Sequence, residues 1–79
     1  AYAEKPQDWG NTLDLALYHL LAGETERAKH LYEEALTGGA PPYLIREALR
    51  DLDDLLALFP DHPHAQAMRE RLQAYLEET

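Results

Sequence analysis

Residues 23–36 read Gly-Glu-Thr-Glu-Arg-Ala-Lys-His-Leu-Tyr-Glu-Glu-Ala-Leu, a glycine turn followed by small and aromatic residues at helical spacing. Gly23 is expected to end one helical segment, because glycine readily adopts the left-handed conformation that closes a helix. Beyond it, Ala28, Tyr32 and Ala35 recur at the spacing of one helix face. The small side chains of Ala28 and Ala35 allow two helices to approach closely, and Tyr32 fills the space beside them. The stretch therefore predicts a helix packed tightly against the one before the turn.

Outward from this stretch, glycines and prolines divide the chain into segments with apolar residues at helical spacing. Gly38 is expected to end the second segment as Gly23 ends the first. Pro42 and Pro63 suit first helical turns, where the missing N–H of proline is not needed. The expected helices cover about residues 6–22, 25–37, 42–58 and 63–77.

The junction before the last helix is also defined by proline, since Pro60 cannot continue a helix. Either Asp61 or His62 is expected to cap the fourth helix, and aspartate is the better capping type. The alternation typical of strands is absent, and Ile45 is the only Ile or Val. Loops this short place successive helices antiparallel and in contact. We therefore predict a single all-α domain, residues 1–79, of four antiparallel helices packed as two helical hairpins.

The stretch from Leu15 to Leu36 resembles a tetratricopeptide repeat, a helix–turn–helix of about 34 residues with a sparse pattern of large and small residues. The matching positions are the turn residues Gly23 and Glu24, the small residues Ala28 and Ala35, the aromatic Tyr32 and the following Leu36. The first half departs from the pattern, because His19 stands where an aromatic is usual and Thr12 where the pattern has Trp. The resemblance implies stacked hairpins and a role in protein–protein contact. The alternative is a generic four-helix bundle in which this spacing is a coincidence.

The charge of the chain excludes several classes of partner. The formal net charge is −8, from 15 acidic and 7 basic residues among 79. This field repels phosphate backbones and anionic lipid surfaces, so we predict neither a nucleic-acid nor a membrane partner. No apolar run is long enough to span a bilayer and no signal peptide is visible, which favours a cytoplasmic location. The chain lacks an initiator Met, so we expect it to be part of a larger protein.

A stripe of leucines on the first helix is the candidate partner surface. Its members are Leu13, Leu17, Leu20 and Leu21. The stripe either packs against the third helix or stays partly exposed as a groove for an amphipathic helix or an apolar peptide. Aromatic residues near segment ends either plug the helix stack or serve as exposed anchors, because Tyr and Trp are enriched at interface hot spots. The predicted partner-binding residues are Leu13, Leu17, Leu20, Tyr43 and Trp9.

The acidic surroundings of this stripe favour a basic partner, mainly through association rate and specificity. Some tetratricopeptide domains grip the C-terminal carboxylate of a partner with Lys and Asn on the first helix. The corresponding positions here are Gly10, Leu13, Asp14 and Leu17. Because none is a cation and Asp14 repels a carboxylate, the resemblance does not extend to that mode of binding.

Histidines and carboxylates are the only candidates for a metal site. Asp61, His62 and His64 can hold Zn or Ni loosely, but the local sequence places no third and fourth ligand beside the histidines. The aspartates within residues 51–54 lie in a helix and lack the Gly and the terminal Glu of a calcium loop. The chain has no Ser and no Cys. We therefore predict no metal, no cofactor and no catalytic residue.

These observations lead to one main prediction and one alternative. The main prediction is a protein–protein interaction module that binds a protein or peptide and is not an enzyme. The alternative is a structural accessory unit that caps or docks on a larger chain or associates with itself, because hairpin stacks need about three repeats to bury their faces. A metal-responsive module using Asp61, His62 and His64 is a third hypothesis.

Overall fold

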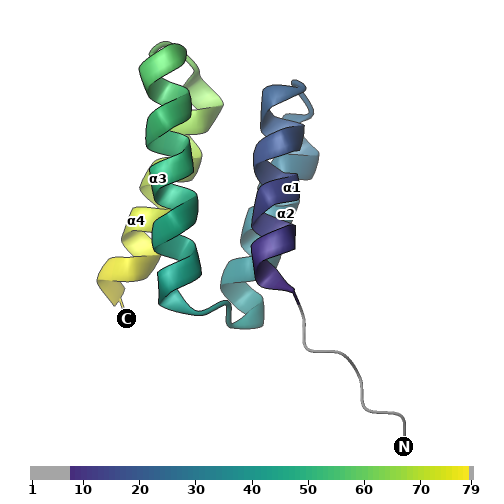
Figure 1. The fold of residues 1–79 in the computed structure, drawn as a ribbon, viewed down its shortest axis with the longest axis vertical. Coiled ribbons are helices and arrows are strands. Elements are labelled where there is room, and N and C mark those ends of the chain that lie inside the picture. The colour runs from purple at the N-terminus through teal and green to yellow at the C-terminus, as the bar shows by residue number, and fades with distance from the viewer. Residues whose placement is uncertain (1–7, 79) are drawn as a thin grey trace, which may run out of the picture.

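A computed structural model describes residues 8–78 of the chain. Within these residues there are four helices and no strand. The helices are α1 (Trp9–Leu21), α2 (Thr25–Gly38), α3 (Pro42–Leu58) and α4 (Pro63–Glu78). The prediction of an all-α fold made of two packed helical hairpins is confirmed (Figure 1). No helix in the described part of the chain is long and apolar enough to cross a membrane.

The first helix begins later than the sequence suggested. Residues 6 and 7 of the expected helix lie outside the described residues, and α1 starts at Trp9. Asp8 is its N-cap, because its carboxylate Oδ1 accepts a hydrogen bond from the backbone N–H of Asn11 at 3.0 Å. A capping residue has non-helical backbone angles, so Asp8 fixes the start of the helix at the next residue.

The end of α2 corrects the prediction for Gly38. Gly38 is the last residue of the helix, and Gly39 takes the left-handed conformation with φ of 92°. Gly38 serves a different purpose, since a Cβ at this position would lie only 2.3 Å from Cη2 of Trp9. The glycine thus allows the indole ring of α1 to pack against the end of α2. At the other turn, Gly23 is left-handed as expected, with φ of 84°.

The cap of α4 is His62 rather than Asp61. Its ring nitrogen Nδ1 accepts a hydrogen bond from the backbone N–H of Ala65 at 3.1 Å. The hydrogen bond satisfies one of the backbone N–H groups that a helix start leaves without an intrahelical partner. It also fixes the tautomer of His62, because the accepting nitrogen carries no proton.

The two hairpins stack in a repeating arrangement. In addition to the antiparallel pairs within each hairpin, α1 contacts α3 and α2 contacts α4. Figure 1 shows that α1 and α3 run in the same direction and form one layer, with α2 and α4 behind them. In an up-and-down bundle each helix is instead antiparallel to both of its neighbours. The second hairpin is therefore placed beside the first as a repeat of the same unit.

The core lies between the two layers and extends through both hairpins. Ala16, Ala28 and Ala35 are completely buried in the first hairpin, and Tyr32 is 1% exposed. The other large, fully buried side chains are Leu20 in the first hairpin and Ile45, Leu52 and Leu72 in the second. The small alanine side chains allow the backbones of α1 and α2 to approach closely, and the ring of Tyr32 packs in the core beside them.

Two ion pairs tie α4 to its neighbours. Arg71 binds Glu33 of α2 through two hydrogen bonds, Nε to Oε2 at 2.8 Å and a terminal guanidinium nitrogen to Oε1 at 3.1 Å. Arg69 binds Asp53 of α3. The Arg71–Glu33 pair links the two hairpins, and the Arg69–Asp53 pair lies within the second hairpin. The two hydrogen bonds between Arg71 and Glu33 fix the relative orientation of these side chains better than a single hydrogen bond would.

Candidate functional site

The leucine stripe of α1 divides into a buried and an exposed part. Leu13 and Leu20 are 5% and 1% exposed and belong to the core, so their side chains are not available to a partner. Leu17 is half-buried, and Leu21 is 55% exposed. The structure thus buries one pair of these leucines and leaves the other pair partly or largely exposed.

The exposed part of the stripe faces α3 across a groove. This depression has a volume of about 250 Å³, and its lining comes from both helices. The lining residues are Leu17, Leu21, Asp51, Asp54, Leu55, Leu58 and Phe59. We call it the α1–α3 groove. Figure 1 shows that α1 and α3, which supply this lining, lie side by side in the same layer.

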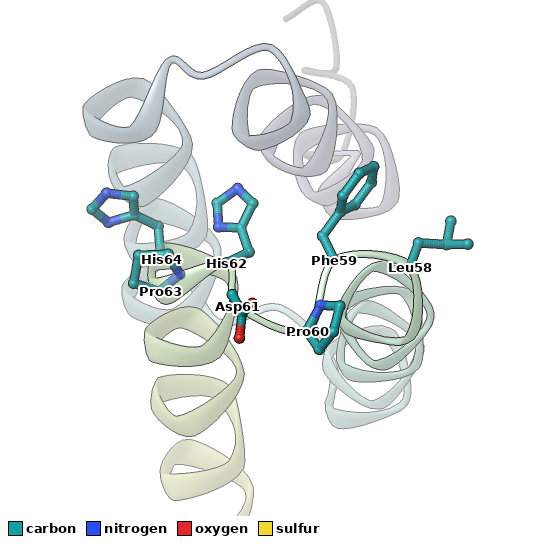
Figure 2. Close-up of a pocket in the computed structure, with 7 residues that line it drawn as sticks. All are labelled: Leu58, Phe59, Pro60, Asp61, His62, Pro63 and His64. Atoms are coloured by element: carbon teal, nitrogen blue, oxygen red, sulfur yellow. The ribbon is translucent and has the colours of Figure 1, made fainter.

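A second, wider depression of about 550 Å³ lies at the turn between α3 and α4. It is lined by Leu58, Phe59, Pro60, Asp61, His62, Pro63 and His64 (Figure 2). Figure 2 shows Phe59 and His62 pointing toward the first hairpin, while Leu58 points to the open side of α3. Since Leu58 and Phe59 line both depressions, the two form one continuous surface.

The exposure of this apolar pair has a local cause. Phe59 is the C-cap of α3, and its N–H donates to the carbonyl of Leu55 at 2.8 Å. Pro60 prevents another helical turn, so no further turn of α3 covers Leu58 and Phe59. Leu58 is 75% exposed and Phe59 is 52% exposed. Large apolar side chains exposed next to each other are typical of interaction surfaces.

Carboxylates border the α1–α3 groove. Burial raises the pKa of Asp51, and the negative charges of Asp14, Asp54 and Glu47 raise it further, against a smaller opposing effect of Arg50. Burial likewise raises the pKa of the Tyr32 hydroxyl, with contributions from Asp51 and Asp14. The aspartates belong to α1 and α3 and Tyr32 belongs to α2, so three helices bring these groups together. The region is negative and partly shielded from water.

The predicted aromatic anchors do not converge on the groove. Trp9 is half-buried and packs against the core, in contact with Gly38. Tyr43 is 57% exposed, but it lies in the first turn of α3, at the opposite end from Leu58. Of the five predicted partner-binding residues, the groove contains Leu17.

Leu58 and Phe59 were not predicted to be surface residues. Helical spacing assigns apolar residues to one face of a helix, but it does not show whether a neighbour covers the last turn. The signal that identifies them is the proline that follows, because a helix that ends at Leu58 leaves its last turn without a further turn to cover it.

The histidines at the α3–α4 turn do not form a metal centre in this structure. The rings of His62 and His64 stand at 76° with centroids 6.0 Å apart. Nδ1 of His62 is engaged in capping α4. Among residues 8–78, no group of three or more His, Cys, Asp or Glu side chains is placed to hold a metal ion.

A separate pair of apolar residues on α1 lies outside the α1–α3 groove. Leu15 is 43% exposed and Tyr18 is 65% exposed. At about 100° per residue, Leu15 lies roughly 120–160° around the helix from Leu17 and Leu21, whereas Tyr18 lies roughly 60–100° from them. Leu15 is therefore on the flank of α1 away from the groove, and Tyr18 is on the outer face between the two.

The chain was compared with known proteins at the levels of sequence and structure. No family model, no curated protein and no solved structure matches it.

Proposed function

We propose that this protein is a tetratricopeptide-like interaction module that docks a segment of another protein in the α1–α3 groove. The observation that carries the proposal is the exposure of Leu21, Leu58 and Phe59 around one depression formed by two hairpins. Burying such side chains against a partner contributes roughly 25 cal/mol per Å² of apolar surface before the costs of association. The groove is lined by apolar side chains and by the carboxylates of Asp51 and Asp54, so it can contact both apolar and polar groups of a partner.

The arrangement of the hairpins supports the tetratricopeptide-like part of the proposal. Stacks of helical hairpins place equivalent helices side by side and use the surface of one layer for recognition. Here α1 is beside α3 and α2 is beside α4. The completely buried Ala28 and Ala35 lie where the resemblance expects small residues at a helix crossing.

The test is to select helical peptides by phage display against the whole protein and to measure their affinities by calorimetry. The variants are Leu21→Ala and Leu58→Ala, and the matched control is Leu15→Ala, which removes the same side chain from the other flank of α1. Truncating a groove leucine is expected to weaken binding about tenfold, as for a central interface residue. The control is expected to change affinity by less than about twofold. Equal losses in all three variants, or no selected peptide that depends on Leu21 or Leu58, would contradict the proposal.

A second candidate function has its own supporting observation. The exposed Leu15 and Tyr18 give the first hairpin an apolar free side, which suits an accessory unit that docks beside another hairpin or a second copy of itself. Sedimentation velocity over a range of concentrations distinguishes the two. A dimer that is lost in Tyr18→Lys and kept in Leu21→Ala supports the accessory function, and a strict monomer argues against self-association.

A further inference from the structure

The α1–α3 groove has two chemically different ends. Because α1 and α3 run in the same direction, equivalent positions on the two helices lie at similar levels (Figure 1). Asp14 on α1 and Asp51 on α3 are close enough for the charge of one to raise the pKa of the other. Asp51 lines the groove and Asp14 lies near it, and we call this pair the acidic end of the groove. Seven residues further along each helix stand Leu21 and Leu58, which together with Phe59 make the apolar end.

The spacing of the two ends fits one kind of occupant. Seven residues of helix rise about 10 Å. In an amphipathic helix laid along the groove, positions i and i+7 are the same distance apart and share one face. A partner helix can therefore reach both ends of the groove at once. Between them, Leu17 and Leu55 provide an apolar floor.

The charges around the acidic end decide what the partner must carry there. The groups that act on Asp51 are Asp14, Asp54, Glu47 and Arg50. Three of the four are anions, and Tyr32 beneath them stays protonated because burial and the aspartates raise its pKa. Like charges held together are unfavourable, and a cation placed between them removes the repulsion. A second copy of this chain does not suit the position, since its formal net charge is −8.

We propose that the α1–α3 groove selects a basic amphipathic helix, whose Arg or Lys side chain lies beside Asp14 and Asp51 while a large apolar side chain occupies the apolar end. This inference rests on the proposed docking function and adds the chemistry of the partner. The acidic end destabilises the free protein and is neutralised in the complex. It therefore acts as a selectivity element, because a neutral or acidic helix gains nothing from it.

The probes are three synthetic helices that carry Leu and, seven residues away on the same face, Arg, Gln or Glu, on a background of Ala and Gln. Affinities are measured by fluorescence anisotropy with the whole chain. The Arg helix is expected to bind about five- to tenfold more tightly than the Gln helix, and the Glu helix most weakly. Asp51→Asn and Asp14→Asn are each expected to reduce the preference for Arg about threefold or more, and salt near 1 M to reduce it as well.

The matched control is Glu34→Gln, which removes the same charge from an exposed position on α2, in the other layer. It is expected to leave the preference for Arg within about twofold, because the field of a distant exposed charge is screened. In urea unfolding, Asp51→Asn is expected to raise the midpoint of the free protein more than this control does, which also shows that the variant folds.

The possible outcomes separate this inference from the proposed function. If the Arg and Gln helices bind equally, and Leu58→Ala weakens both, the groove docks a protein segment without selecting charge, and the inference is wrong. If Glu34→Gln lowers the preference as much as Asp51→Asn, the attraction comes from the net charge and the inference is again wrong. If none of the three helices binds, both the inference and the docking of a helix in this groove are contradicted.

Discussion

The two hairpins close in different ways. In α1–α2 the helix crossing is made by alanines, with Ala16, Ala28 and Ala35 completely buried. In α3–α4 a single alanine, Ala65, is completely buried, together with the longer side chains of Ile45, Leu52 and Leu72. The contact is more extensive within the first hairpin, as expected when backbones approach closely. Added volume should therefore damage the first hairpin, and removed volume should damage the second.

The free sides of the hairpins differ as well. On the first hairpin the exposed pair is Leu15 and Tyr18. On the second, the ion pair of Arg69 with Asp53 bridges α4 and α3, and Gln73 donates to Glu77 at 3.3 Å. A polar outer face is characteristic of the terminal unit of a helical stack. The outer side of the second hairpin thus carries polar contacts, whereas the first hairpin exposes apolar side chains.

The largest expected effect is the removal of volume from the second hairpin. Leu52→Ala leaves a cavity at a completely buried position and should lower the free energy of unfolding by about 3 kcal/mol. Leu58→Ala is the control, since Leu58 is 75% exposed, and it should change stability by less than about 0.5 kcal/mol. Urea titration followed by circular dichroism measures both. Similar losses of unfolding free energy in the two variants would mean that the packing of buried leucines does not stabilise the second hairpin.

Added volume is the corresponding change for the first hairpin. Ala28→Leu places three more carbons where the helices cross, and should lower the free energy of unfolding by about 2 kcal/mol. Ala67→Leu adds the same atoms at an exposed position of α4 and should be nearly neutral. The same titration applies. A tolerated Ala28→Leu would contradict the close approach of α1 and α2.

Two helical glycines should respond in opposite directions to the same substitution. A Cβ at Gly38 would lie 2.3 Å from Trp9, whereas one at Gly10 would meet nothing closer than Oδ1 of Asp8 at 3.5 Å. Gly38→Ala should therefore lower the free energy of unfolding by about 1 kcal/mol, through displacement of the indole. Gly10→Ala should raise it by up to about 1 kcal/mol, because alanine favours the helix. Tryptophan fluorescence during thermal unfolding reports both, and a stabilising Gly38→Ala would show that the indole moves freely.

The smallest expected effect concerns the acidic end, where the two hairpins meet. The pKa of Asp51 is raised above its ordinary value of 3.8, mainly by burial and by Asp14, Asp54 and Glu47, with Arg50 opposing. The folded state therefore binds this proton more tightly than the unfolded chain does. The free energy of unfolding should fall as pH rises through 3.8 and the raised value, and Asp51→Asn should remove part of this fall.

Urea titrations at a series of pH values check this dependence. The control is Glu34→Gln, which removes one negative charge, as Asp51→Asn does. The difference between wild type and Asp51→Asn should grow through the acidic range and then stay constant. If Glu34→Gln follows the same course, the dependence belongs to the overall charge of the protein rather than to the junction of α1 and α3.

Local signals were sufficient for the positions of the helices. The starts expected at residues 25, 42 and 63 are those of the structure. The errors are also local. The first helix begins at Trp9 because Asp8 caps it, and α2 extends through Gly38 because the left-handed residue is Gly39. Gly38 and Gly39 are equally able to take the left-handed conformation that ends a helix. Gly38 stays in the helix, where its missing Cβ makes room for the ring of Trp9.

The surface was predicted less well than the helices. The spacing of Leu13, Leu17 and Leu20 defines a face of α1, but the structure buries two of them and leaves Leu17 in the groove. Helical periodicity fixes directions around one helix axis and does not say which neighbour covers them. Leu58 and Phe59 were missed for the same reason, since their exposure depends on where the chain turns after Pro60.

Four helices, their turns and the small residues that let the first pair approach were predictable from local sequence, because each depends on backbone preferences within a few residues. The placement of the second hairpin beside the first, with α1 parallel to α3, was visible in the folded molecule alone. That placement turns leucines from two distant segments into one groove and brings Asp14 to Asp51. Contacts between residues far apart in the chain follow from how whole hairpins pack, which the local pattern of residues does not encode.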